Sequence, residues 1–445
     1  MGGGLMQLVA YGAQDIYLTG NPQITFFKVV YRRHTNFAVE SIEQTFNGQA
    51  DFGKRVTATI SRNGDLIQQM YLEVVLPQVT GTSDYAPYWT YGVGNAMVKQ
   101  AEIEIGGQLI DRQYGDWMDI WTELTVPAGK RLGYDNMVGN WVSNSHGAQW
   151  SGVAANDRTY KLYVPLQFWF NRNPGLALPL IALQYHEVKL NLEIRSLPDL
   201  LTSQSVSNFY SGTPSGSLSC KLYVDYVYLD TDERRRFAQV SHEYLIEQVQ
   251  FTGDETINAG DSNKNVTLNF NHPVKELVWV HITQVHSSTA SSGNKQGSRW
   301  LCFSPAYSSY GVDQDTFGSA KLQLNGHDRF SVRDADYFRK VQNYEHHTST
   351  PRVGTVSQDV IYGGGYQTNH QQYIYTYSFA LSPEEHQPSG TCNFSRIDNA
   401  VLQLNYRDRN GDDTTHNAAM NLKVFAVNYN VLRIMSGMGG LAYSN

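Results

Sequence analysis

The chain has 445 residues, of which 17% are charged and 12% aromatic, with 29 tyrosines and a formal net charge of −7. This length predicts two or three domains, each with its own core. The acidic balance and the lack of a basic arm exclude avid nucleic-acid binding, which depends on Lys and Arg neutralising phosphates. Low charge and abundant tyrosine fit an all-β protein with a large polar contact surface, and equally an ordinary Tyr-rich sandwich.

Cysteine usage and hydropathy indicate the compartment. Cys220, Cys302 and Cys392 are odd in number and widely spaced, which favours neither a disulfide framework nor a zinc site. No signal peptide and no apolar run long enough to span a membrane is found in the sequence. We therefore expect synthesis in a reducing cytosol, with the chain soluble until it assembles.

The chain opens with a segment of no clear period. Residues 1–25 run from Gly2-Gly3-Gly4 to Gly20-Asn21-Pro22, and we interpret them as an arm outside the first core. Apolar, β-branched and aromatic segments then follow at short intervals and predict strands. These segments are 55–60, 70–76, 102–105, 162–170, 188–194 and 221–229.

A hairpin is the clearest local element. Apolar residues alternate with Glu102 and Glu104 up to Ile105, and Gly106-Gly107 then supplies a two-residue turn. The two glutamates share one face, and we interpret that face as solvent-exposed rather than as a pair of catalytic carboxylates.

The chain is duplicated. The hairpin pattern recurs at 320–327, where Asn325-Gly326 is a strong turn signal. Other segments repeat in the same order at a nearly constant spacing, which indicates two copies of one β-rich fold rather than a short-period solenoid. The matched pairs are 42–48 with 246–253, 56–60 with 266–270, and 188–192 with 401–405.

Each hairpin precedes a helix candidate with an apolar stripe. The first stripe is formed by Trp117, Ile120, Trp121 and Leu124, and Phe338 and Val341 begin a weaker one in the second copy. We interpret these aromatics as a lid on a sandwich rather than as a ligand box.

Segments of different character separate the strands. Residues 230–237 are densely and oppositely charged, and we interpret them as a connector rather than a nucleic-acid patch. Five long irregular segments predict a rigid scaffold whose loops recognise partners. They are 78–98, 128–159, 196–219, 283–317 and 343–369.

Known catalytic and metal motifs are incomplete. His242-Glu243 begins like a zinc motif, but Ile246 stands where the second histidine is required. His346-His347 looks like an isolated pair in a polar loop, and residues 408–413 lack the spacing of a calcium loop. The sequence therefore predicts no catalytic, cofactor-binding or metal-binding residue, no cofactor, and no enzyme.

Six longer segments together resemble one family. They are 3–15, 18–27, 176–190, 242–253, 387–398 and 428–441. The chain resembles the major capsid proteins of large icosahedral double-stranded DNA viruses, particularly those that infect algae. The resemblance implies an all-β fold of two consecutive eight-stranded antiparallel jelly rolls with short helices in loops.

The resemblance also implies a domain order and an assembly. We expect an arm at 1–25, a first jelly roll at 26–229, a connector at 230–240 and a second jelly roll at 241–445. Three chains would form a homotrimeric capsomer of pseudo-hexagonal outline, and the trimers would tile the shell of the virion. We place the arm inward against minor capsid proteins or neighbouring trimers, and the loops 283–317 and 343–369 outward.

The resemblance also implies what surrounds the capsid shell. In this family an internal membrane separates shell and genome, which implies only indirect membrane contact and no direct nucleic-acid binding. Glycans on outer loops, synthesis and assembly in the host cytoplasm are also implied. The alternative function is a carbohydrate-binding or carbohydrate-cleaving duplicated β-sandwich, a monomer that would expose aromatics such as Trp89, Trp150 or Trp300.

Overall fold

The computed structural model is made of two compact units, Met1–Phe37 and Ala38–Asn445. The smaller unit contains the helix α2 (Ile16–Thr19), none of whose residues is buried. No described helix is long and apolar enough to cross a membrane. The structure describes residues 6–7, 9–10, 12–19, 21, 31, 33–80, 87–140, 151–154, 159–203, 213–214, 216–283, 300–303, 315–351, 372–406 and 419–443.

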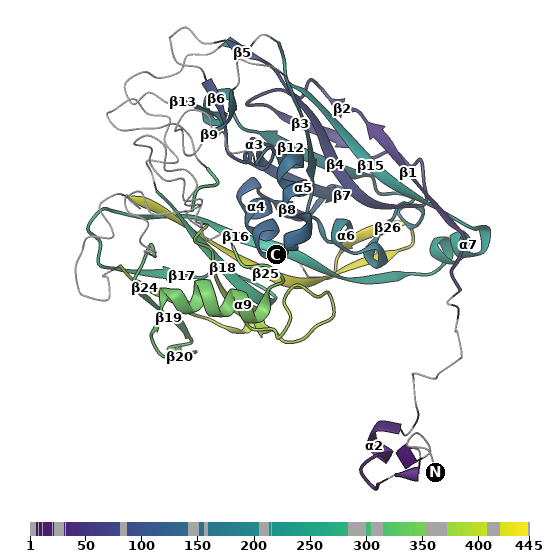
Figure 1. The fold of residues 1–445 in the computed structure, drawn as a ribbon. Coiled ribbons are helices and arrows are strands. Elements are labelled where there is room, and N and C mark those ends of the chain that lie inside the picture. Colours follow the sequence, from purple (N-terminus) through teal and green to yellow (C-terminus); the bar gives the residue numbers. More distant parts are fainter. Residues whose placement is uncertain are drawn as a thin grey trace. The chain divides into compact units, whose positions relative to one another are not determined.

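The first half of the larger unit is a sandwich of two antiparallel sheets (Figure 1). One sheet has the order β1 (Phe37–Gln44), β15 (Ser219–Leu229), β4 (Leu66–Leu76) and β10 (Tyr160–Pro165), with β11 (Leu178–Pro179) beside β4. The other has the order β2 (Phe46–Asn47), β3 (Arg55–Thr59), β12 (Val188–Ile194), β7 (Val98–Ile105) and β8 (Gln108–Gln113). Small sheets join β13 (Leu201–Ser203), β6 (Pro87–Thr90) and β9 (Ser151–Ala154), and β14 (Thr213–Pro214) with β5 (Val79–Thr80).

The second half repeats this arrangement. One sheet has the order β16 (His242–Ile257), β25 (Met420–Met435), β18 (Pro273–Thr283) and β22 (Tyr375–Ser378), with β23 (Cys392–Asn393) beside β18 and β26 (Met438–Leu441) beside β25. The other has the order β17 (Asn263–Thr267), β24 (Ala400–Asn405), β19 (Ser319–Leu324) and β20 (His327–Asp328), with β21 (Arg333–Asp334) beside β19.

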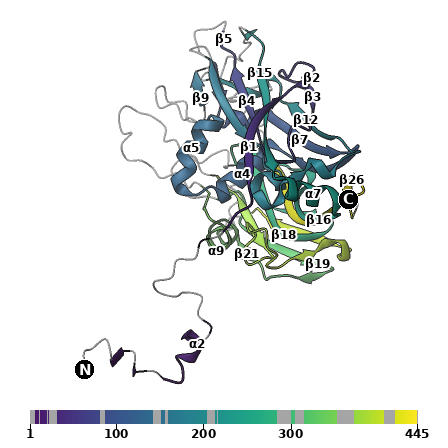
Figure 2. The same ribbon diagram turned by 90° about the vertical axis from the view of Figure 1, so that its right-hand side faces the viewer.

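The strand order identifies the fold. In each half the first strand pairs with the last long strand, β1 with β15 and β16 with β25, as in a jelly roll. The predicted double jelly roll is therefore confirmed. We call the sandwich of β1–β15 the first roll and that of β16–β26 the second roll; Figure 2 shows both from the side.

Alternating burial explains why these segments are strands. In β12 every second residue from Val188 to Ile194 is buried, so one face of the strand lies on the core. The core of the first roll also takes in Ile246, Leu432 and Ile434 from the long strands of the second roll. The two rolls consequently share apolar surface.

Both predicted hairpins are confirmed. Ile105 pairs with Gln108 across Gly106-Gly107, whose φ angles are 58° and 84°. Leu324 pairs with His327 across Asn325-Gly326, at φ 51° and 78°. Positive φ at both central positions is the requirement of a primed hairpin turn, which Gly and Asn meet at little cost.

Helices lie in the connections between strands. The charged segment expected to be a connector forms α7, where the Asp230 carboxylate accepts from Thr231 N at 2.7 Å and two acidic residues occupy the first turn. Part of the segment 128–159, expected to be irregular, forms a helix as well. The described helices of the larger unit are α3 (Val93–Met97), α4 (Gly115–Thr125), α5 (Ala128–Val138), α6 (Trp169–Arg172), α7 (Thr231–Gln239), η4 (Tyr337–Val341) and α9 (Gln342–His346), with short 3-10 turns η1 (Pro174–Leu176), η2 (Leu180–Ala182), η3 (Leu197–Leu200) and η6 (Phe394–Arg396).

Candidate assembly surfaces

Helix α4 of the first roll packs on the second-roll sheet β16-β25-β18-β22, on the side that faces away from the core of the second roll. Trp117 lies 5.4 Å from Phe425 and 5.7 Å from Trp121, measured between ring centroids. Residues 115–124 are all buried. We call this sheet surface the covered face. It consists of Val249, Val278, Val280, Ile282, Phe425 and Val427, and Ile120 and Leu124 also pack on it. The predicted lid is confirmed, and the surface it covers belongs to the other roll (Figure 1).

The start of α4 requires a glycine. A Cβ atom on Gly115 would lie 2.2 Å from Asn95 O and 2.3 Å from Val98 O. No side chain fits at those distances, so Gly115 lets the helix approach the end of β7 closely. The approach fixes the position of Trp117 over the second roll.

A buried ion cluster fastens α4 to β25. The Asp116 carboxylate contacts the Lys423 ammonium and lies 3.3 Å from the Arg195 guanidinium. Burial alone would raise the pKa of Asp116, but Lys423 and Arg195 hold it below its usual value. Such a pair is costly to break, because the remaining charge stays buried.

A second ion cluster joins α6 to the second roll. Glu247 lies 2.9 Å from Lys275 and 3.3 Å from Arg172 of α6. Burial alone would raise the pKa of Glu247, but the neighbouring His386, 3.5 Å away, and the two cations lower it. Charges of both rolls thus neutralise each other inside the joint.

Strand β8 of the first roll also docks on β16. Gln248 Nε2 donates to Ile110 O, and Val249 N donates to the Asp111 carboxylate at 3.3 Å. Burial raises the pKa of Asp111 to about 7. Apolar, ionic and hydrogen-bonding contacts together join the rolls into one unit.

In the first roll, the sheet β1-β15-β4-β10 corresponds to the second-roll sheet that carries the covered face. It has a row of tyrosines on the side that faces away from its own core. The ring of Tyr71 stacks on Tyr223 at 5.4 Å with an interplanar angle of 9°, and lies 6.2 Å from Tyr163. Tyr163 is 36% exposed. Ion pairs flank the row: Lys221 with Glu43 at 3.0 Å and Lys161 with Glu73 at 2.9 Å. We call this row with its ion pairs the open face.

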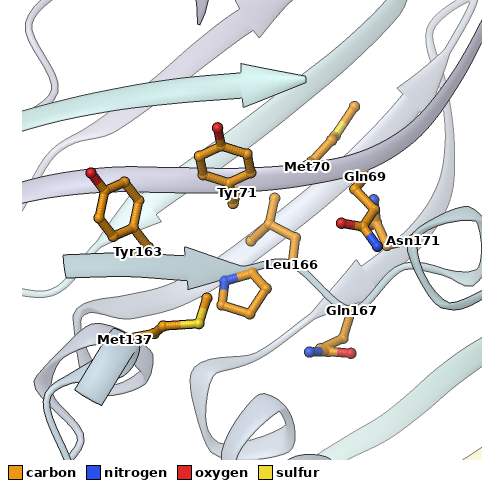
Figure 3. Close-up of a pocket in the computed structure, with 9 residues that line it drawn as sticks. Gln69, Met70, Tyr71, Met137, Tyr163, Leu166, Gln167 and Asn171 are labelled. Atoms are coloured by element: carbon orange, nitrogen blue, oxygen red, sulfur yellow. The ribbon is translucent and has the colours of Figure 1, made fainter. Parts of the chain in front are cut away.

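A pocket of about 440 Å³ opens beside the tyrosine row (Figure 3). Tyr71 and Tyr163 form one wall, and Met137 of α5 stands opposite. Among the described residues its lining carries no carboxylate, histidine or cation, so the pocket is suited to hold an inserted side chain. The other lining residues are Gln69, Met70, Pro165, Leu166, Gln167 and Asn171.

The expectation that His347 belongs to an isolated pair is wrong. His347 is buried, with Nε2 3.0 Å from the Glu276 carboxylate and Nδ1 3.0 Å from that of Glu384. Burial alone would lower the pKa of His347, but Glu276 and Glu384 raise it to about 9. The partners are distant in sequence, so only the fold brings the three side chains together. They do not form a metal site: the described residues contain no group of three suitable ligands.

The expected solvent exposure of Glu102 is also wrong. Glu102 is only 5% exposed and accepts from Arg55 and Arg112, each at 2.7 Å. Glu104 is half-buried and accepts from Asn191 at 3.0 Å. Long arginine side chains of neighbouring strands cover the carboxylate, so an alternating pattern does not by itself place Glu102 in water.

Other predicted positions are placed as follows. Trp89 is fully buried, which contradicts its expected exposure in a glycan-binding protein. Trp300 donates from Nε1 to Asp199 O at 2.9 Å, and the Arg195 guanidinium lies 4.2 Å from its ring. His242 contacts Phe237 O at 2.8 Å. Trp150, residues 408–413 and most of the two loops expected outward lie outside the described residues.

Two family models cover most of the chain. The model described as "Major capsid protein N-terminus" matches residues 25–230. The model described as "Large eukaryotic DNA virus major capsid protein" matches residues 233–357 and 364–440.

Individual relatives agree with these models. The chain is 54% identical to the major capsid protein of Pyramimonas orientalis virus and 44% identical to that of Paramecium bursaria Chlorella virus 1, with 100% of both chains covered in each case. A solved capsid structure of the latter virus has a TM-score of 0.72 at 39% identity, covering 95% of this chain and all of that one. The Faustovirus major capsid protein, at 14% identity and a TM-score of 0.69, shares the fold; the match covers 96% of this chain and 94% of that one. The chain therefore belongs to the major capsid proteins of large eukaryotic DNA viruses.

Proposed function

We propose that this chain forms homotrimers of pseudo-hexagonal outline that tile the icosahedral shell of a virion. The observation that supports this proposal most strongly is the pair of jelly rolls with the same strand order, joined within one unit. Three such chains present six similar lobes, and a threefold head-to-tail contact closes into a ring. The relatives named as major capsid proteins support a structural rather than an enzymatic role.

The proposed division of the chain is an arm at 1–25, a first jelly roll at 26–229, a connector at 230–240 and a second jelly roll at 241–445. The family-model boundary near residues 230–233 and the position of α7 support it. We propose that the arm lies on the inner side, against minor capsid proteins or neighbouring trimers. Apart from α9 and the buried residues 301–303, the loops 283–317 and 343–369 would face outward and carry any glycans.

The proposed surroundings follow from the same reasoning. The net charge of −7 supports a shell without direct nucleic-acid contact. We also propose, from the family resemblance, that any internal membrane is touched only indirectly. Synthesis and assembly would take place in the host cytoplasm.

Analytical ultracentrifugation of the purified chain tests the trimer. The expected species has three times the monomer mass. A monomer that binds glycans would overturn the proposal and favour the duplicated carbohydrate-binding sandwich.

A truncation tests the arm. Removal of residues 2–25 should leave a soluble trimer that no longer builds closed shells in electron micrographs. A matched control replaces the same residues with a scrambled segment of equal length and should fail likewise. Normal particles from the truncated chain would overturn the inner assignment.

A further inference from the structure

Within one chain, the two rolls contribute different elements to their contact: the first roll a helix, the second a sheet face. The helical connection between β8 and β10 of the first roll contains α4, which seats on the covered face of the second roll. The second roll has the matching connection, η4–α9 between β20 and β22, and the first roll has the matching sheet surface, the open face. The contact between the two rolls of one chain therefore uses α4 and the covered face, and it does not use their counterparts, η4–α9 and the open face.

The helix η4–α9 has one buried and one exposed side. Phe338, Arg339, Gln342 and Asn343 are buried, whereas Val341 is 40% and Tyr344 80% exposed. Lys340 and Glu345 flank these two side chains and are exposed. Residues 337–341 form a π-helix that continues into α9, and in both parts the exposed side chains lie on the side away from the buried ones. This side is short, partly apolar and bordered by both signs of charge.

We propose that in the homotrimer η4–α9 of each copy docks on the open face of the next copy, with Tyr344 directed to the pocket beside Tyr71 and Tyr163. The inference rests on the proposed trimer and adds which surfaces form its contact. It repeats between chains the helix-on-sheet contact that α4 makes within a chain. Six rolls then form a ring in which every helix connection covers the next sheet face, by turns within a chain and between chains.

The chemistry of the two surfaces suits this docking. A tyrosine row can face water before assembly, because each ring has a polar tip, and can still bury a large apolar area afterwards. Tyrosine is enriched in protein interfaces for this reason. The open face presents charges of both signs, Lys161 with Glu73 and Lys221 with Glu43. These side chains can form ion pairs with both Lys340 and Glu345 of the helix.

Cysteine cross-linking tests which surfaces meet. The double variant Tyr344→Cys with Tyr163→Cys, oxidised as the full-length assembled chain, should give covalent trimers, because each chain contributes one helix and one face. A control pairs Tyr344→Cys with Val240→Cys, at an exposed position after α7, and should remain uncross-linked. The single variants and the unmodified chain measure any background from Cys220 and Cys392. Covalent dimers alone would indicate a twofold contact and overturn the inference.

A charge substitution tests the energetic contribution of the same contact. Tyr344→Asp should raise the concentration at which trimers dissociate at least tenfold, since it places a carboxylate in an uncharged pocket. Val240→Asp should leave that concentration unchanged. Thermal unfolding of the variant and of the unmodified chain, both measured below the concentration of association, should be the same and would show that the variant still folds.

The outcomes separate the two proposals. If the unmodified chain sediments as a monomer, the proposed function itself fails. If it sediments as a trimer, while Tyr344→Asp dissociates like the control and the cysteine pair forms no covalent trimer, only the assignment of surfaces fails.

Discussion

The covered face and the open face occupy the same position in two copies of one fold, yet they differ in chemistry. The covered face is built from valine, isoleucine and phenylalanine, and a helix of the same chain seals it during folding. The open face carries tyrosines between ion pairs and stays partly exposed in the single chain. A surface sealed within its own chain can be fully apolar, whereas one that waits for a second chain must remain soluble meanwhile.

The largest difference should appear when an aromatic ring is removed from each face. Trp117→Ala should lower the free energy of unfolding by about 3–5 kcal/mol, because it leaves a cavity between α4 and the covered face. Tyr223→Ala on the open face should have a much smaller effect on the single chain. Urea denaturation below the concentration of association measures both. Equal losses would show that both faces are sealed within the chain.

A lysine on each face gives the next comparison. Lys423→Met leaves Asp116 buried beside α4 with only Arg195, and should cost about 3 kcal/mol of unfolding free energy. The matched Lys221→Met removes an ion pair between two exposed side chains and should leave the unfolding midpoint unchanged within error. Neutral behaviour of Lys423→Met would mean that Arg195 alone is enough to keep the buried Asp116 carboxylate stable.

The sequence predicts the local features that support this comparison and misses the distant ones. Turn residues and alternation predict both hairpins, and an apolar stripe predicts α4, because each signal lies within a few neighbouring residues. Helix α5 escapes prediction, since among its residues only Asp135 and Val138 are buried and no stripe forms. The contact of α4 with the second roll and the burial of Glu102 depend on partners far along the chain. Family membership came from a resemblance of whole segments, which periodicity alone does not provide.

The buried histidine between Glu276 and Glu384 should make stability depend on pH. The pKa of His347 rises from an ordinary 6.5 to about 9 in the fold. Its stabilising contribution, roughly 2–3 kcal/mol, is therefore complete below pH 6.5 and is lost as the pH rises through 9. His347→Gln should flatten the dependence of unfolding free energy on pH between these values. His346→Gln is the control and should preserve it; a preserved slope in His347→Gln would assign the dependence to another group.

The smallest effect concerns Asp111, which holds the edge of the covered face through Val249 N. Because burial raises the pKa of Asp111 to about 7, its contribution is complete below pH 3.8 and is lost as the pH rises through 7. Asp111→Asn removes this loss and keeps an oxygen for Val249 N. The new amide can donate to Gln113 Oε1, a buried atom with no hydrogen-bond partner among the described residues, once that side-chain amide rotates. We expect a gain of about 1–2 kcal/mol at pH 8 and none at pH 4, measured by urea denaturation. A loss at pH 8 would show that the joint between the rolls depends on the negative charge near Arg172.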